Sequence, residues 1–345
     1  MKVSLKPLNQ QVIVITGASS GIGLATARAA AQRGARLVLA SRNRKALDTL
    51  VEELTALGAE AIAVTADVGI QSDHEKILEA AITRFGSVET WVNNAGVSIF
   101  GKLEEVAIED QRQLFETNYW GVVYGSLVAV GHLRLLGGAL INIGSEVSDR
   151  AIPLQGAYSA AKHAVKGFTD ALRLELEADG APVSVTLIKP ASIDTAFVKH
   201  AKNYMDVEPQ LPSPIYSPNA VADAILYAAV HPMRDIFVGS AAKAISAMGQ
   251  RMPAVADKLL GPSTIRAQRS DNLARPKHDA LWDASDTAQE QTYTDRYVHA
   301  SSLYTDLNTR WRGLMWTGAG LAALYTAMRM LPRSKSDNRD RDDAK

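Results

Sequence analysis

Short apolar runs alternate along the first two-thirds of the chain with longer segments whose apolar residues recur every three or four positions. The runs lack the polar alternation of strands with one exposed face, so we expect both faces of each strand to be buried. The intervening segments, such as "ALDTLVEELTALG", have the periodicity of helices. The pattern predicts strands at residues 12–16, 36–41, 61–67, 88–94, 139–145, 183–190 and 235–239.

Buried strands separated by helices predict a parallel sheet with helices on both faces. Right-handed crossovers then give an α/β fold, a Rossmann-type doubly wound sheet of about seven strands, over residues 8–240. We expect a mostly helical or irregular C-terminal extension at 241–312. Its first part, to residue 262, keeps a helical pattern, and the polar stretch beyond it predicts a loosely attached arm. A hydrophobic helix at 313–331 and a disordered, charged tail at 332–345 complete the predicted domains.

Composition excludes several classes of function. Lys plus Arg and Asp plus Glu both number 37, so no overall charge favours nucleic acid. The absence of cysteine excludes disulfides, thiolate chemistry and cysteine-ligated zinc, and it agrees with a reducing compartment. The seven histidines lack paired ligand spacing, so we predict no metal site. No signal peptide is evident, and we expect a cytoplasmic protein.

The segment "GLMWTGAGLAALYTAMRML" at 313–331 leaves membrane association open. Its uncharged core, residues 313–328, is shorter than the roughly 20 residues that span a bilayer. Trp311, Trp316 and several arginines lie near its ends, as interfacial anchors do. Three alternatives follow: a helix docked on the protein or a partner subunit, an in-plane membrane helix, or a short spanning anchor.

A glycine-rich turn joins the first predicted strand to the first helix, in "VITGASSGIGLATARAAAQRG". A tight turn that opens a helix directs several N–H groups and the positive end of the helix dipole at one position, which suits a pyrophosphate. Glycine there lets the backbone approach a ligand closely. We therefore predict a dinucleotide-binding loop formed by Gly17, Ser19, Ser20, Gly21, Ile22 and Gly23.

The end of the second predicted strand informs the choice of dinucleotide. An NAD-binding fold usually carries an acid there, about 20 residues after the loop, to bind the ribose 2′-hydroxyl. Here the sequence "LASRNRKALD" has no acid before Asp48. A guanidinium at this position suits a 2′-phosphate, so Ser41 and Arg42 favour NADP(H) over NAD(H). Arg44 and Lys45 fit equally well as solvated charges at the start of a helix.

Tyr158 and Lys162 lie four residues apart in "GAYSAAKHAVKGF". This spacing is about one helical turn, so both side chains can reach the same small volume. The pair alone is compatible with an acid and its activating ammonium, or with an aromatic ring beside a surface cation.

A set of motifs in order along the chain resembles the short-chain dehydrogenase/reductase family and favours the first alternative. They are "TGASSGIG" (16–23), "DV" (67–68), "NNAG" (93–96), the Asn118 of "ETNYWG", "GS" (144–145), "YSAAK" (158–162) and "KPASIDT" (189–195). The resemblance implies an oxidoreductase that interconverts a carbonyl and a secondary alcohol with NADP(H).

The resemblance assigns four residues to catalysis: Asn118, Ser145, Tyr158 and Lys162. Tyr158 is the expected general acid in reduction and base in oxidation, and Lys162 is expected to lower its pKa and to bond the nicotinamide ribose. Ser145 is expected to polarise the substrate carbonyl. Asn118 is expected to anchor a water that leads protons from Lys162 to solvent.

The resemblance also implies the remaining contacts with the dinucleotide. Family members usually have glycine after Pro190, where this chain has Ala191, and the extra methyl group is expected to narrow the substrate mouth or shift the turn. The expected contacts are Asp67 and Val68 near the adenine, Asn94, Ala95 and Gly96 along the adenosine, and Pro190, Ile193 and Thr195 near the nicotinamide.

Residues 196–218 follow the Pro190 turn and contain four prolines and several apolar side chains. They predict either a lid over an apolar pocket or a proline-stiffened surface connection. We expect a small-molecule substrate, a hydrophobic ketone or aldehyde, and the homo-oligomer usual in the family. Two alternatives use the same fold: a non-catalytic dinucleotide sensor or scaffold, and an epimerase or lyase that retains the dinucleotide.

Overall fold

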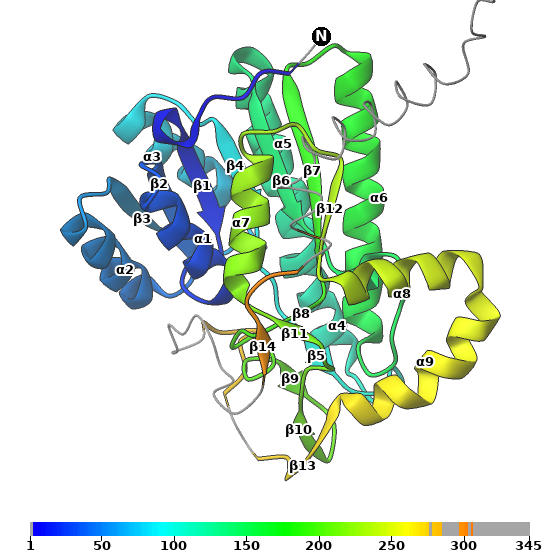
Figure 1. The fold of residues 1–345 in the computed structure, drawn as a ribbon. Coiled ribbons are helices and arrows are strands. Elements are labelled where there is room, and N and C mark those ends of the chain that lie inside the picture. The colour runs from blue at the N-terminus through cyan, green and yellow to red at the C-terminus, as the bar shows by residue number, and fades with distance from the viewer. Residues whose placement is uncertain (1–2, 276–277, 285–296, 303–304, 306–345) are drawn as a thin grey trace, which may run out of the picture. The chain divides into compact units, whose positions relative to one another are not determined.

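Parallel strands form the central sheet of the computed structural model, which describes residues 3–275, 278–284, 297–302 and 305. The strands follow the order β12-β7-β6-β4-β1-β2-β3 (Figure 1). All seven predicted strands are confirmed, and so is the doubly wound Rossmann-type sheet. The strands are β1 (Val12–Thr16), β2 (Arg36–Ser41), β3 (Ala61–Thr65), β4 (Thr90–Asn93), β6 (Gly138–Ile143), β7 (Val183–Pro190) and β12 (Asp235–Val238).

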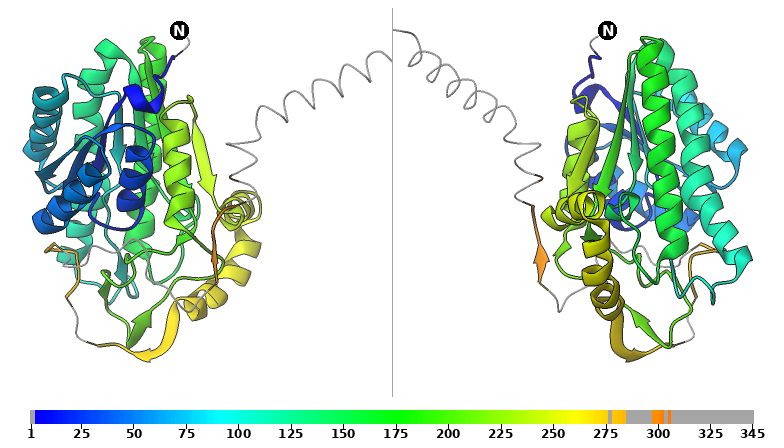
Figure 2. Two further views of the ribbon diagram at one scale, coloured as in Figure 1. Left: turned by 60° about the vertical axis from the view of Figure 1, so that its left-hand side comes forward. Right: turned by 90° about the vertical axis from the view of Figure 1, so that its right-hand side faces the viewer.

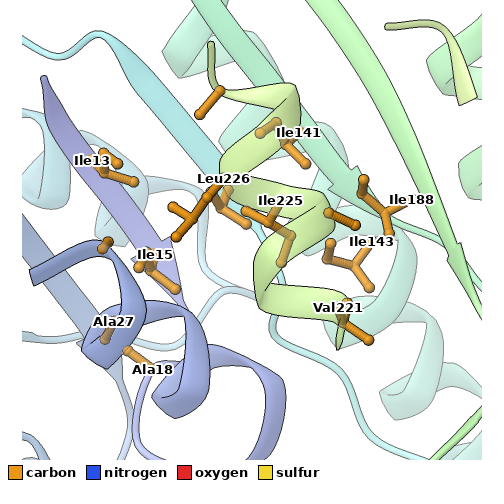
Figure 3. Close-up of a cluster of buried hydrophobic side chains, with 14 of the residues drawn as sticks. Ile13, Ile15, Ala18, Ala27, Ile141, Ile143, Ile188, Val221, Ile225 and Leu226 are labelled. Atoms are coloured by element: carbon orange, nitrogen blue, oxygen red, sulfur yellow. The ribbon is translucent and has the colours of Figure 1, made fainter. Parts of the chain in front are cut away.

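Helices cover both faces of this sheet, which explains why its strands are apolar without alternation. Successive side chains of a strand point to opposite faces. Ile13 and Ile15 pack into one buried cluster (Figure 3), and Val12 and Val14 pack into another on the opposite face. Helices α1 (Gly21–Ala31), α2 (Arg44–Ala56) and α7 (Pro218–Ala228) contribute to the first cluster, and α3 (Gln71–Phe85), α5 (Gly121–Leu136) and α6 (Gly156–Ala178) to the second.

The direction of winding reverses between β1 and β4. From β1 the chain proceeds outward to β2 and β3, and it then returns to place β4, β6, β7 and β12 on the other side. In such sheets the loops at the carboxyl ends of the strands separate at the reversal and leave a crevice. The predicted glycine loop follows β1 and therefore lies at this crevice.

Smaller elements gather near the end of the sheet at which β7 and β12 stop (Figures 1 and 2). They include the π-helical turn Glu116–Trp120 and the 3-10 turn Glu146–Ser148, whereas the 3-10 turn Leu8–Gln10 precedes β1 at the opposite end of the sheet. The others are β5 (Ile99–Phe100), α4 (Ile108–Phe115), β8 (Ser192–Ile193), β9 (Lys202–Asn203), β10 (Val207–Pro209), β11 (Ile215–Tyr216), α8 (Ser240–Arg251), α9 (Pro253–Ala267), β13 (Arg269–Leu273) and β14 (Val298–His299).

The C-terminal extension begins with the predicted helical segment, which forms α8 and α9. The prediction of a loosely attached arm beyond it is wrong for the described residues. Strand β13 pairs antiparallel with β10, and β14 pairs in parallel with β11. Gln268 is buried and accepts a hydrogen bond of 2.7 Å from the Gln155 amide, and Leu281 is completely buried. Backbone pairing and single anchoring side chains therefore hold a segment that has no amphipathic pattern.

Residues Met1–Thr305 form one compact unit, which includes the described part of the extension. The predicted division between a catalytic domain and an extension at residue 240 stays a prediction. The predicted hydrophobic helix at 313–331 and the tail at 332–345 lie outside the described residues. Within the described ranges, no helix combines the length and apolar character needed to cross a membrane.

We predict that Leu281→Ala lowers the free energy of unfolding by about 2–4 kcal/mol, because it empties a buried site. Leu273→Ala in the same extension is the matched control: Leu273 is 76% exposed and Leu281 0%. We expect the control to change stability by less than about 0.5 kcal/mol. Denaturant unfolding measures both, and equal small effects would show that the extension does not depend on Leu281.

Candidate active site

A cavity of about 260 Å³ lies where β1, β2, β3, β4, β6 and β7 end. Residues at the ends of these six strands and in the loops that follow them line it, so their polar groups face one space. The structure brings together all of the predicted site residues except Gly23 and Asn118, which lie behind the wall. The predicted residues that line the cavity are Gly17, Ser19, Ser20, Gly21, Ile22, Ser41, Arg42, Asp67, Val68, Asn94, Ala95, Gly96, Ser145, Tyr158, Lys162, Pro190, Ile193 and Thr195.

The glycine loop leaves no room for side chains on its inner side. Gly17 and Gly21 have φ values of 66° and 51°, which side chains disfavour. A Cβ on Gly23 would lie 2.2 Å from the Gly17 carbonyl oxygen, and one on Gly21 would lie 3.0 Å from Thr195. The loop therefore packs tightly on α1 and against the segment after β7. This close backbone at a helix N-terminus fits the pyrophosphate of a dinucleotide.

Asn94 fixes the end of β4 to the glycine loop. Its side-chain amide donates a hydrogen bond of 2.9 Å to the Thr16 carbonyl, and its backbone N–H donates to the Thr16 hydroxyl at 3.0 Å. These bonds hold the two strands together at the point where the winding reverses. The crevice is thus rigid on the side where the predicted adenosine contacts lie.

Arg42 follows β2 and lines the cavity, but its guanidinium also holds the C-terminal extension. Its two terminal nitrogens donate to the carbonyls of Ala280 at 2.5 Å and Trp282 at 3.0 Å. The Asp67 carboxylate lies 4.0 Å away. A guanidinium has five N–H donors, so two bonds to the extension leave others for a ligand.

Residues 278–284, which we call the strap, were not predicted as part of the site. Leu281 of the strap packs into the cluster that contains Val97 and Leu114, and the Trp282 indole donates to the Asp110 carboxylate at 2.8 Å. Ala280 and Ala284 line the cavity. The signal available in the sequence was the isolated apolar pair "LW" in a polar stretch, and it does not reveal which surface the pair covers.

Ser145, Tyr158 and Lys162 face one another across the cavity from β6 and α6. The Ser145 hydroxyl is close enough to Tyr158 to lower the pKa of the phenol. The Lys162 ammonium donates to the Ile143 carbonyl at 2.8 Å and lies 5.7 Å from the centre of the Tyr158 ring. Lys162 is 3% exposed, so the alternative of a ring beside a surface cation is wrong.

Burial controls the proton affinities of this group. It raises the pKa of Tyr158 well above the ordinary value. The Ser145 side chain lowers this pKa and partly offsets the effect of burial, whereas the charge of Glu146 raises it further. Burial also lowers the pKa of Lys162 to about 8. The protein by itself therefore holds Tyr158 as the protonated phenol, the form that a general acid requires.

Asn118 lies in the π-helical turn, an irregularity frequent at functional sites. Its amide pairs with the Val97 backbone: the oxygen accepts from the Val97 N–H and the nitrogen donates to the Val97 carbonyl, both at 2.8 Å. Asn118 thus fixes the connection between β4 and β5 beneath the cavity. The expected water at Asn118 stays a prediction.

Ala191 is accommodated without loss of strand pairing. Its N–H donates to the Val238 carbonyl at 2.9 Å, which continues the pairing of β7 with β12. An added Cβ on Gly239 would lie only 2.8 Å from the Ala191 methyl. Glycine at 239 therefore makes the space for alanine at 191, and the methyl group lines the cavity.

Residues 196–218 form part of the cavity wall, which favours the lid hypothesis over a surface connection. The Phe197 ring packs edge-on against the Tyr158 ring, with 5.5 Å between their centres. Leu211 and Pro212 line the same space.

Glu146, directly after Ser145, also lines the cavity. We did not predict Glu146, although a lone acid after the "GS" motif was visible in the sequence.

We predict that Gly23→Ala weakens dinucleotide binding at least about tenfold, which corresponds to roughly 1.4 kcal/mol. The new Cβ would collide with the Gly17 carbonyl and displace the loop. Gly167→Ala in α6 is the control, because nothing lies within 4 Å of its added Cβ. Titration calorimetry with NADPH measures both. Unchanged affinity of a folded Gly23→Ala protein would rule out this loop as the binding cradle.

Comparison with known proteins agrees with this geometry. The family model for short chain dehydrogenase matches residues 11–205. An uncharacterized oxidoreductase of Bacillus subtilis (strain 168), YxnA, is 46% identical over 332 residues, which cover 95% of this chain and 93% of the relative.

Two solved structures share the fold. A short chain dehydrogenase/reductase from Burkholderia phymatum in complex with NAD has a TM-score of 0.65 and 27% identity, covering 79% of this chain and 100% of that one. An alcohol dehydrogenase from the archaeon Thermococcus sibiricus complexed with 5-hydroxy-NADP has a TM-score of 0.59 and 29% identity, covering 66% and 95%. The chain is an oxidoreductase that belongs to the short-chain dehydrogenase/reductase family.

Proposed function

We propose that this protein is an NADP(H)-dependent oxidoreductase that interconverts a carbonyl and a secondary alcohol, with reduction as the physiological direction. The observation that carries the proposal is the meeting of Ser145, Tyr158 and Lys162 in the cavity that the glycine loop closes. A sensor or scaffold needs the loop alone and gains nothing from a buried ammonium beside a phenol and a serine hydroxyl.

The roles of the side chains follow from their positions. A bound nicotinamide dinucleotide supplies the hydride. The Ser145 hydroxyl binds the carbonyl oxygen of the substrate and stabilises the charge that develops there. Tyr158 donates its proton to the same oxygen, and its phenolate accepts a proton in the reverse direction. Lys162, held by the Ile143 carbonyl, places a positive charge where it stabilises that phenolate and can bind the nicotinamide ribose.

The cavity wall supports a hydrophobic ketone or aldehyde as substrate. Phe197 covers one side of Tyr158, and Val147, Ile152 and Leu211 add aliphatic surface. Such a wall expels water as the substrate enters, which strengthens the interaction of Ser145 and Tyr158 with the carbonyl. Residues 196–218 act as the lid over this side.

Arg42 supports NADP(H) over NAD(H). It lies at the end of β2, where an NAD-binding fold has an acid, and its bonds to the strap carbonyls hold the guanidinium at the cavity. Solved relatives carry either kind of dinucleotide, 5-hydroxy-NADP in one and NAD in the other. The preference of this chain therefore depends on its own residues at 41–43.

We predict that Tyr158→Phe lowers kcat for carbonyl reduction by about 100- to 10,000-fold, the usual contribution of a general acid. The NADPH dissociation constant should change less than about twofold, since the ring and its packing remain. A panel of ketones and aldehydes followed by NADPH absorbance identifies a substrate and measures the loss. The control is Tyr297→Phe, at a tyrosine 80% exposed. Substantial activity of Tyr158→Phe would exclude Tyr158 as the acid.

We predict that Arg42→Ala weakens NADPH binding by about 10- to 100-fold more than NADH binding, because it removes charge-assisted bonds to the 2′-phosphate. The change also removes two bonds to the strap, but that effect is common to both dinucleotides and cancels in the ratio. Arg44→Ala is the control, since Arg44 is paired with Asp48 at 2.8 Å on the surface. Equal losses for both dinucleotides would remove Arg42 from the phosphate site.

A further inference from the structure

Glu146 is a carboxyl group inside the cavity that the proposed reaction does not use. It directly follows Ser145 and is the first residue of the 3-10 turn Glu146–Ser148. Its side chain is partly buried and lines the same space as Ser145 and Tyr158. It is close enough to Tyr158 for its charge to raise the pKa of the phenol.

No side chain or backbone group of the described residues satisfies this carboxyl. Within those residues it has neither a hydrogen bond nor an ion pair, and burial raises its pKa to about 7. The other charged groups of the cavity differ: Arg42 is bonded to the strap and Lys162 to the Ile143 carbonyl. A partly buried carboxyl that faces a cavity and has no partner in the described residues is free to accept a hydrogen bond from a ligand.

The turn itself does not need the acid. Ser145 and Ser148 already form a capping box: the Ser145 hydroxyl accepts from the Val147 N–H at 3.3 Å, and the Ser148 hydroxyl accepts from the Ser145 N–H at 3.1 Å. The backbone groups that an acid at a helix start would satisfy are therefore occupied. Capping of this turn therefore does not account for the presence of Glu146.

The surroundings define the kind of group that would bind there. Val147, Ile152 and Leu211 add aliphatic surface to the cavity, and Phe197 packs against Tyr158. One unpartnered acceptor in such a wall fixes the orientation of a ligand that carries a matching donor. We propose that Glu146 is a specificity-determining residue that accepts a hydrogen bond from a hydroxyl or ammonium group adjacent to the reacting carbonyl of the substrate.

This inference rests on the proposed carbonyl reduction and names its substrate class, a hydrophobic carbonyl compound with a neighbouring O–H or N–H donor. The titratable groups that share the cavity with Glu146 are Tyr158, Lys162 and His200, with Arg42 and Asp67 on its wall as well. An ionised Glu146 disfavours the phenolate of Tyr158. A donor on the substrate, above all a cationic one, offsets that repulsion while it is bound.

The test compares acetophenone with its α-hydroxy and α-amino derivatives in the wild type, Glu146→Gln and Glu146→Leu. The measured quantity is the ratio of kcat/KM for each derivative to that for acetophenone, so the intrinsic reactivity of the ketones cancels between proteins. We expect Glu146→Leu to lower both ratios by about 10- to 100-fold, the effect of losing a hydrogen bond to a charged group. Glu146→Gln should lower mainly the α-amino ratio, because its amide oxygen still accepts from a hydroxyl.

Glu175→Gln is the matched control, a charge removal at an exposed position of α6 that should leave all ratios unchanged. The corresponding alcohols, 1-phenylethanol, 1-phenylethane-1,2-diol and 2-amino-1-phenylethanol, are also titrated by calorimetry in the presence of NADP⁺ or NADPH. Binding needs no turnover, so calorimetry tests the role of Glu146 separately from the proposed carbonyl reduction. If the enzyme oxidises NADPH with no member of a broad ketone panel, the proposed function is overturned. If each of the three alcohols binds to Glu146→Leu as tightly as to the wild type, the role of Glu146 is overturned.

A pH profile distinguishes this role from a merely structural one. In alcohol oxidation the rate rises with pH as Tyr158 loses its proton, and the anion of Glu146 opposes that loss. The Glu146→Gln variant lacks this anion. Its rate of 1-phenylethanol oxidation should therefore rise at a lower pH than the rate of the wild type. An unshifted limb would mean that the carboxyl does not act at the reacting centre.

Discussion

Burial of the parallel sheet on both faces is the constraint on which the site depends. Helices cover Ile13 and Ile15 on one side of β1 and Val12 and Val14 on the other. A polar group inside the sheet must therefore be paired there, as Asn142 of β6 is with Asn93 and Thr169. The polar groups that are available to a ligand therefore gather at the strand ends. The reversal of winding between β1 and β4 then opens the edge of the sheet at which the ends of six strands surround the cavity.

The same burial determines how the polar groups at that edge behave. In a medium of low polarity charged forms are disfavoured, so the pKa of Lys162 falls to about 8 and that of Glu146 rises to about 7. Their interactions with a ligand are stronger than in water for the same reason. The Ile143 carbonyl holds Lys162 and the Phe197 ring packs against Tyr158 before any substrate enters, which reduces the reorganisation that a reaction requires.

The features that a local pattern of residues determines could be predicted from the sequence. The strands follow from apolar runs, and the glycine loop follows from the geometry of a strand–turn–helix connection. Contacts between segments far apart were not predictable, because a single side chain carries no periodic signal. Nothing in the sequence indicates that Leu281 fills a buried site, or that Gly239 provides the space for the Ala191 methyl. Arg42 was identified from a missing acid, but its bonds to the strap come from tertiary structure alone.

The strap and the lid are joined, although they come from different parts of the chain. Asp110 accepts from the Trp282 indole of the strap at 2.8 Å and from the Tyr204 hydroxyl of the lid at 2.7 Å. The Ala280 N–H of the strap also donates to the His200 carbonyl at 2.8 Å. A displacement of the lid would therefore strain the strap, whose carbonyls hold Arg42. The substrate side and the adenosine side of the cavity are in this way connected through the Asp110 carboxylate and the backbone bond from Ala280 to His200, outside the sheet that positions the reacting groups.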